Sequence, residues 1–245
     1  MSTSTFSTQI ELIETTENEF IKTCKPYIEN GYINKPRDDD VRSLLFIAVA
    51  YNYMNAAKIL IEMGSDVNYG KNMYSGYKIS PLFVACQKGF LPMCKLLIEN
   101  GANINETEYS PLYCACQGGH LEICKFLLEK GANVNYATSD NETPLYIATF
   151  DGYIEICKLL LENGADVNQT RIEKKGGFHS IIGTFDGEAP IHMVCEAGNI
   201  ELVKLFTEKG ANVNQERFDG GTPLSIAEKK GHIEICKFLK EKGAK

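Results

Sequence analysis

The chain has 245 residues, of which 44% are hydrophobic and 23% charged, a composition typical of a globular protein that folds without disulfide staples. Its net charge is −7 and it has no run of Lys and Arg, which argues against binding nucleic acid through the phosphate groups. The longest apolar run, residues 44–51, is too short to cross a bilayer, and the first residues do not resemble a secretory signal. We therefore expect no nucleic-acid partner and no membrane insertion.

Nine cysteines are scattered along the chain, which is an odd number. This usage is typical of buried free thiols in a reducing compartment. We expect the protein to be cytoplasmic, with the nucleus as the alternative location.

The first predicted element is a helical segment, EFIKTCKPYIENGYIN, which begins at Glu19 and is interrupted by Pro26. It represents a half unit in residues 19–40, and residues 1–18 before it are expected to form a flexible tail. A pair of helices is then predicted from Ser43, in the segment SLLFIAVAYNYMNAAKILIEMGSDVN.

Five closely similar segments follow, beginning near residues 80, 110, 143, 189 and 222, and the third reads TPLYIATFDGYIEICKLLLENGADVN. In this segment Thr143 is suited to cap a short first helix, and Pro144 to occupy its first position. Gly152 is expected to end that helix, and the amphipathic second helix from Ile154 is expected to end at Gly164. One such pair cannot bury its apolar face alone, whereas stacked pairs can.

This pattern resembles the ankyrin repeat family, whose TPLH-x-A start, Gly-His before the second helix and Gly-Ala-Asp/Asn-Val-Asn turn occur here. The resemblance covers residues 19–245. It implies an all-α solenoid of helix-turn-helix repeats, with about six full repeats after an N-terminal half repeat, in one domain. The repeat near 43 has Leu44 and Asn52 in place of the usual Pro and Gly, as expected near a capping end. The last repeat has polar residues in apolar columns, as a terminal cap requires: Lys237, Lys240, Glu241 and Lys242.

The stretch CACQGGHLEIC, residues 114–124, offers the ligand types of a zinc site: Cys114, Cys116, His120 and Cys124. The repeat that begins at Thr143 carries different residues at the same places: Ile147, Thr149, Tyr153 and Cys157. We therefore interpret these positions as packing positions, and predict no metal and no cofactor. Cysteines in the same column of neighbouring repeats should stay reduced, because packed helices stand too far apart for a disulfide.

The histidines are interpreted as structural. His120, His192 and His232 occupy histidine positions of the family pattern, which implies that they help to bond the turns between helices. His179 lies outside the pattern and is expected to be solvated. The sequence has no Ser-His-Asp order, GxxxxGK[ST] motif or HExxH motif, so we predict that the protein is not an enzyme.

The loops that join successive repeats, here called fingers, differ in length. Nine positions separate the turn Asn from the next Pro in the usual case, as from Asn135 to Pro144. The finger before Pro111 is three residues shorter, the one before Pro81 is four longer, and the one before Pro190 is thirteen longer. Such differences are where repeat proteins individualise their binding face.

The longest finger reads QTRIEKKGGFHSIIGTFDGEA, and its end, FDGEAP, realigns with the FDGGTP of the next finger. The inserted residues are therefore predicted within 169–184. They include three basic residues, Arg171, Lys174 and Lys175, and an apolar patch of Phe178, Ile181 and Ile182. Two interpretations stay open, a tolerated surface loop and an extended hairpin that contacts a partner, and the apolar side chains favour the second.

In the family, the fingers and the exposed ends of the first helices line one concave face, which implies a partner there. Candidate partner-binding residues on that face are aromatic, apolar or charged: Tyr74, Tyr77, Lys88, Tyr109, Tyr136, Phe150, Asp151, Lys174, Lys175, Phe178, Ile181, Ile182, Glu196, Phe218 and Lys229. The mixed signs of charge indicate a protein partner rather than a polyanion.

The predicted function is therefore non-catalytic protein–protein interaction, as a scaffold, adaptor or inhibitor, by a chain that is monomeric on its own. The alternatives are an adaptor that recruits a target to a degradation or signalling enzyme, and a regulatory subunit of an enzyme. Turn asparagines such as Asn168, with Leu160 eight residues before it, also resemble family sites of asparagine hydroxylation.

Overall fold

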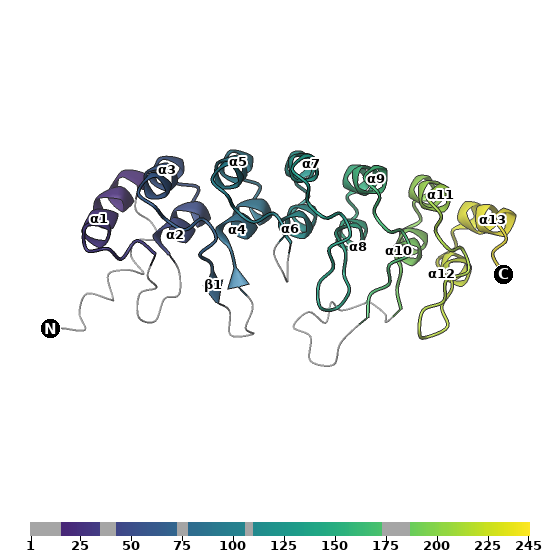
Figure 1. The fold of residues 1–245 in the computed structure, drawn as a ribbon. Helices are drawn as coiled ribbons and strands as arrows, with labels where there is room; N and C mark the ends of the chain where they lie inside the picture. Colours follow the sequence, from purple (N-terminus) through teal and green to yellow (C-terminus); the bar gives the residue numbers. More distant parts are fainter. Residues whose placement is uncertain (1–15, 35–42, 73–77, 106–109, 173–186) are drawn as a thin grey trace. The chain divides into compact units, whose positions relative to one another are not determined.

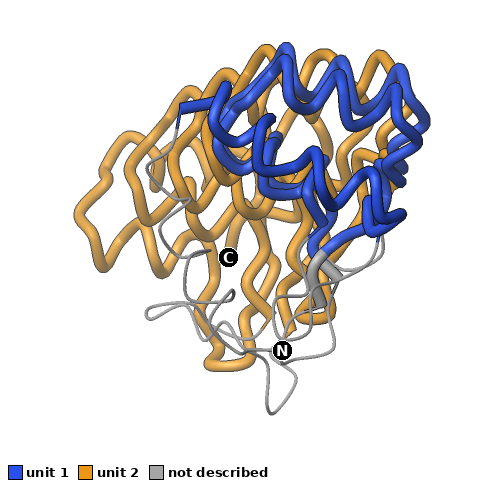
Figure 2. The backbone as a smooth tube through the Cα atoms, turned by 90° about the vertical axis from the view of Figure 1, so that its left-hand side faces the viewer, with its two compact units in different colours: residues 1–103 blue, residues 104–245 orange. Residues whose placement is uncertain are grey.

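The computed structural model describes residues 16–34, 43–72, 78–105, 110–172 and 187–245. Contacts between Cα atoms divide the chain into two compact units, Met1–Asn103 and Ile104–Lys245 (Figure 2). None of the helices in the described ranges is long and apolar enough to cross a membrane.

The first unit contains a leading helix, helix pairs and one short strand ladder: α1 (Glu17–Glu29), α2 (Leu44–Ala50), α3 (Met54–Glu62), β1 (Lys71–Asn72), β2 (Lys78–Ile79), α4 (Pro81–Gln87) and α5 (Leu91–Glu99). Helix α1 packs against α3, and α2 packs against both α3 and α4. The two strands are antiparallel, with Lys71 opposite Ile79 and Asn72 opposite Lys78.

The second unit consists of further helix pairs: α6 (Pro111–Gln117), α7 (Leu121–Glu129), α8 (Pro144–Phe150), α9 (Ile154–Glu162), α10 (Pro190–Ala197), α11 (Ile200–Glu208), α12 (Pro223–Lys230) and α13 (Ile233–Glu241). Within this unit the first helices α6, α8, α10 and α12 form one row, and the second helices α7, α9, α11 and α13 form another (Figure 1). The two fingers of this unit that are described in full, residues 135–143 and 214–222, extend from the row of first helices, away from the second helices (Figure 1). The predicted all-α repeat architecture is thus confirmed.

The first helices begin where local chemistry predicts. The hydroxyl of Thr143 accepts a hydrogen bond from the Tyr146 amide, and Pro144 holds the first helical position. The same arrangement begins α12, where Thr222 accepts from the amide of Ser225. The predicted ends are also confirmed, since Gly152 and Gly164 follow the last residues of α8 and α9 with φ of +78° and +84°.

Helix α1 differs from its prediction in two ways. It begins at Glu17, two residues before the expected start, because Thr16 and Glu19 form a reciprocal capping box. It also continues through Pro26 to Glu29, so the expected interruption is wrong. Proline removes only one N–H here, in the last turn, while the buried Phe20 and Cys24 anchor the same helix in the core. The predicted tail before it lies almost wholly outside the described residues.

Turn asparagines connect each repeat to the next within a unit. The Asn168 side chain donates from Nδ2 to the Gly210 carbonyl, and its Oδ1 accepts from the amide of Asn212. Asn135 makes the same two bonds with the Gly164 carbonyl and the Asp166 amide. These bonds satisfy backbone groups at the C-terminal ends of the second helices, which would otherwise lack a partner in the helix.

Candidate functional site

The fingers share one stem. In each of the fingers described to its base, the third residue after the turn asparagine pairs with the second residue before the proline position. The amide of the first of these residues donates to the carbonyl of the second, at 3.0 Å, in three fingers: Thr138 to Glu142, Arg171 to Glu188, and Arg217 to Gly221. In the first unit the same two positions are Lys71 and Ile79, which face each other in the β1–β2 ladder. The fingers are therefore hairpins of common base and different tip.

This stem locates the insertion more narrowly than the sequence comparison does. Residues 218–220 separate Arg217 from Gly221, whereas residues 172–187 separate Arg171 from Glu188. Gly187 and Gly220 both have positive φ, which confirms that the two Phe-Asp-Gly segments realign at this glycine. The thirteen added residues are therefore 172–184, which lie within the predicted bounds of 169–184, because Arg171 belongs to the common stem. Residues 173–184 of the insertion lie outside the described residues.

Arg171, which the sequence groups with Lys174 and Lys175 near the insertion, is buried and belongs to the common stem. Its side chain is 1% exposed and its Nε donates to Oε1 of Glu142 at 3.0 Å, on a carboxylate that is itself 2% exposed. The other oxygen of Glu142 accepts a hydrogen bond of 2.9 Å from the Tyr113 hydroxyl of α6. A first helix, the following finger and the finger after that are thus joined by one buried polar group.

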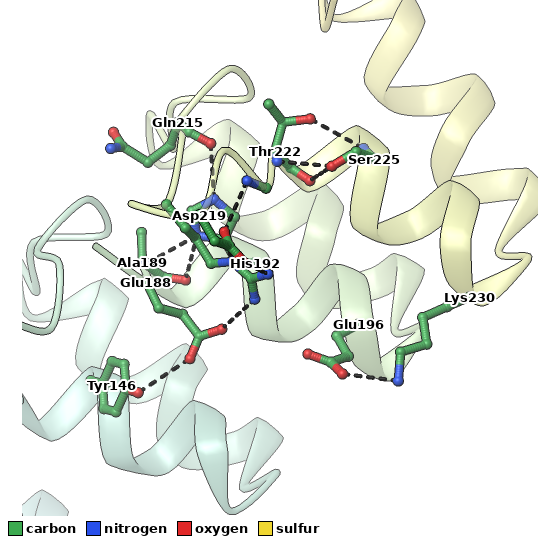
Figure 3. Close-up of polar contacts among 12 residues, drawn as sticks. Tyr146, Glu188, Ala189, His192, Glu196, Gln215, Asp219, Thr222, Ser225 and Lys230 are labelled. Atoms are coloured by element: carbon green, nitrogen blue, oxygen red, sulfur yellow. Dashed lines mark hydrogen bonds and ion pairs between the residues drawn. The ribbon is translucent and has the colours of Figure 1, made fainter. Parts of the chain in front are cut away.

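A second copy of this arrangement lies one repeat further on. The carboxylate of Glu188 accepts from the Tyr146 hydroxyl of α8 and from Nη1 of Arg217, both at 3.3 Å (Figure 3). Arg217 also forms an ion pair of 2.8 Å with the exposed Asp219. Burial raises the pKa of Glu188. Burial and the nearby Glu188 carboxylate also raise the pKa of Tyr146, so the tyrosine hydroxyl stays protonated and donates its hydrogen bond.

We call these two Tyr–Glu–Arg groups the stem networks. Sequence reasoning missed them, although a signal was present in the columns. Glu142 and Glu188 both lie two residues before a proline, and Arg171 and Arg217 both lie three residues after a turn asparagine. This signal appears when both ends of each finger are compared, from the turn asparagine to the proline.

His192 takes the place of tyrosine at the same column of α10. Its Nδ1 accepts a hydrogen bond of 3.0 Å from the amide of Ala189, which cannot cap the helix with a hydroxyl. Its Nε2 bonds at 2.9 Å to the carbonyl of Gln215 in the next finger (Figure 3). His232 likewise bonds to the carbonyl of Glu196 at 3.1 Å. Both histidines therefore have the structural role that the sequence predicted.

Acidification is expected to destabilise the protein through His192. Burial lowers the pKa of this imidazole from 6.5, so the unfolded chain takes up the proton first. The stability that neutral His192 contributes is complete above pH 6.5 and is lost as the pH falls through the folded-state pKa. We expect His192→Tyr, which copies Tyr113 and Tyr146, to flatten the fall in unfolding free energy between pH 7.5 and 5 in urea titrations.

Glu188 is the internal control for that experiment. Its raised pKa acts in the opposite direction, because a folded state that holds the proton more readily gains stability on acidification. It is present in both proteins, so the difference between their two pH profiles reports the histidine. Parallel profiles would show that His192 does not titrate differently in the folded and unfolded states.

The candidate partner-binding residues fall into two groups. Eight lie outside the described residues: Tyr74, Tyr77, Tyr109, Lys174, Lys175, Phe178, Ile181 and Ile182. The other seven are described. Lys88 is exposed in the first unit, and four are exposed in the second: Phe150, Asp151, Phe218 and Lys229. Tyr136 and Glu196 are half-buried, and Glu196 forms an ion pair of 2.9 Å with Lys230 (Figure 3).

Two exposed phenylalanines, Phe150 and Phe218, differ in their surroundings. Phe150 is 40% exposed at the C-terminal end of α8, beside Asp151. Phe218 is 73% exposed at a finger tip, but one edge of its ring lies against Gly187, where an added Cβ would come within 2.9 Å. Phe218 therefore steadies the base of the longest finger while it presents most of its ring to solvent.

The CACQGGHLEIC stretch is a packing element. Cys114, Cys116 and Cys124 are buried free thiols, and Sγ of Cys116 lies 3.7 Å from Sγ of Cys124. Burial raises the pKa of Cys116 well above its ordinary value, which keeps the thiol protonated and unreactive. Within the described ranges, no group of three or more His, Cys, Asp and Glu side chains could hold a metal ion. The close approach of cysteines from the two helices of one repeat was not foreseen.

The comparisons with known proteins agree with this architecture. A family model described as ankyrin repeats, in three copies, matches residues 12–108, 82–171 and 174–245. No curated protein matches the chain significantly. Ankyrin repeats are generally protein–protein interaction modules. Because these matches span nearly the whole sequence, the chain belongs to the ankyrin repeat family.

Proposed function

We propose that this chain is a non-catalytic protein-recognition module that binds a partner through its finger tips and the exposed ends of its first helices. The observation that carries the proposal is the contrast between the buried bases of the fingers and the exposed residues at a finger tip and at the ends of the first helices. The stem networks bury and neutralise the charges at the base, while Phe150, Asp151, Phe218 and Lys229 remain exposed. Rigid stems with exposed aromatic and charged groups suit protein recognition, because little conformational entropy is lost on binding.

Three side chains of types that can act in catalysis, Cys157, Cys195 and His192, are buried. Burial raises the pKa of Cys195 to about 12 and that of Cys157 to about 11, so neither thiol is a ready nucleophile. His192 is fully buried between two backbone groups. These features favour a scaffold, adaptor or inhibitor over an enzyme.

The test is affinity capture with a variant of this surface. Phe150→Ala, Asp151→Ala and Phe218→Ala together are expected to reduce the recovery of at least one partner by about tenfold or more, since central aromatic contacts each carry 2 kcal/mol or more at interfaces. Quantitative mass spectrometry of the captured proteins measures this. The identity of the lost partner would then distinguish a scaffold from an adaptor of a degradation or signalling enzyme and from a regulatory subunit.

The matched control is Lys125→Ala with Lys204→Ala, on the second helices α7 and α11. Both lysines are half-exposed and form ion pairs at the surface, with Glu122 and Glu234. Equal loss of partners in the control and in the finger variant would overturn the assignment of this surface. Unchanged recovery of every partner in the finger variant would do so as well.

A further inference from the structure

The side chain of the residue before a second helix can pack against the preceding repeat. In the second unit, the ring of Tyr153 lies over Gly119, where an added Cβ would come within 2.7 Å of it. The ring of His232 lies over Gly198 in the same way, at 2.5 Å, and its Nε2 bonds to the carbonyl of Glu196. An aromatic ring thus packs on the glycine that ends the preceding first helix.

Asn199 occupies the same position before α11 and behaves differently. Its Oδ1 accepts a hydrogen bond of 3.0 Å from the amide of Leu202, so the side chain turns back to cap its own helix. No atom lies within 4 Å of a Cβ built on Gly152, the glycine that a ring at position 199 would cover. The place that Tyr153 and His232 fill elsewhere is open here.

This place is part of a groove of about 550 Å³ in the second unit. Its lining includes Gly152, Tyr153, Ile154, Lys158, Asn199 and Glu201. Tyr153 and Ile154 are both 37% exposed and supply its apolar wall. Phe150 lies two residues before Gly152, as Glu196 lies two residues before Gly198, and its carbonyl accepts none of the hydrogen bonds formed among the described residues. The groove therefore combines an apolar wall with a backbone acceptor.

The charges around the groove are predominantly negative. Its lining contains the carboxylates of Glu155 and Glu201 against the single amine of Lys158. Lys158 forms an ion pair of 2.8 Å with Glu155. Glu201 belongs to none of the ion pairs found in the parts of the chain that the structure describes. A ligand with positive charge next to its ring complements this arrangement.

We propose that the groove beside Gly152 binds a histidine side chain presented by a basic segment of a partner protein. The imidazole packs on Gly152 and donates to the carbonyl of Phe150, as His232 does on Gly198 with the carbonyl of Glu196. Flanking lysine or arginine residues lie near Glu201 and Glu155. The groove is at the C-terminal end of α8, whereas the fingers join its N-terminal end. The groove therefore lies beside Phe150 and Asp151, at one exposed helix end of the proposed recognition surface, and the proposal rests on that function while it assigns a ligand away from the fingers.

The test uses the peptide Gly-Lys-His-Lys-Gly and two relatives, one with Ala in place of His and one with Glu in place of both Lys. Each is titrated into the full chain, with the amide resonances of Gly152 and Ile154 followed by NMR. The histidine-lysine peptide is expected to shift both resonances. Each relative is expected to bind at least about tenfold more weakly, a difference of about 1.4 kcal/mol or more in binding free energy. Equal affinities for the three peptides, or shifts elsewhere only, would overturn the proposal.

Two variants at position 199 provide the structural control. Asn199→His places a ring over Gly152 from within the chain and is expected to reduce peptide binding at least about tenfold. Asn199→Asp keeps the helix cap and the open groove, so it is expected to bind as the wild type does or more tightly. Binding that survives in the folded histidine variant contradicts the proposal.

Failure of this proposal and failure of the proposed function are distinguishable. Phe218→Ala alters the finger surface and leaves the groove intact, so it should bind the peptide normally. Asn199→His leaves the finger residues unchanged. Partners that depend on the fingers should therefore still be captured by it.

Discussion

Replacing Arg171 with alanine is expected to lower the free energy of unfolding by about 3–5 kcal/mol, because it leaves a buried charge without its partner. The Glu142 carboxylate is 2% exposed and would retain only the hydrogen bond from Tyr113. Leaving a buried carboxylate uncompensated costs far more than the pair itself contributes. Urea or guanidinium titration followed by circular dichroism measures the change.

A double variant separates the charge from the packing. Arg171→Met with Glu142→Gln removes both charges and leaves an acceptor for Tyr113. It should therefore be more stable than Arg171→Ala alone. Lys125→Ala, which removes an exposed ion pair with Glu122, should unfold as the wild type does. If Arg171→Ala cost no more than Lys125→Ala, the stem network would have no role in stability.

Removal of residues 172–184 is expected to abolish at least one protein interaction while the chain stays as stable as the wild type. The shortened finger reads QTRFDGEAP and matches QERFDGGTP, the next finger, in length and in its Arg-Phe-Asp-Gly segment. Arg171 and Glu188 are then separated by three residues, as Arg217 and Gly221 are. Affinity capture and a thermal melt, carried out on the same protein, measure the two parts of the prediction.

A larger deletion, of residues 169–184, provides the contrast. It removes Arg171 together with the insertion, so it should lose about 3–5 kcal/mol of stability, as the alanine variant does. Loss of folding in the smaller deletion would show that the insertion is structural. Full retention of every partner would show that it is a tolerated loop.

The two deletions differ by three residues, yet they are expected to behave differently because the long finger has two functional parts. Its base belongs to the stem network, which joins Tyr113 of α6 with Glu142 and Arg171 of successive fingers. Its inserted part lies beyond the hydrogen bond between Gly187 and Arg171. Partner binding and stability are therefore assigned to adjacent segments of one loop.

The sequence by itself determined the helical repeats and most of their boundaries. The start of α8 at Pro144 and its end before Gly152 depend on hydroxyl capping, proline geometry and glycine conformation, all of which act within a few residues. Repetition of the same local signals along the chain made the family recognisable. Pro26 is the exception, because packing of Phe20 and Cys24 outweighs the one hydrogen bond that proline removes.

Only the tertiary structure decided which polar side chains are buried and which places stay open. The burial of Arg171 could not be predicted from the sequence, since its partner Glu142 is 29 residues away and their contact depends on the stacking of two fingers. Asn199 holds the position that Tyr153 and His232 hold in other repeats, but its side chain caps α11 and leaves Gly152 uncovered. Local signals specify where helices begin and end, whereas the fate of a charged or amide side chain depends on neighbours that only the packed repeats bring together.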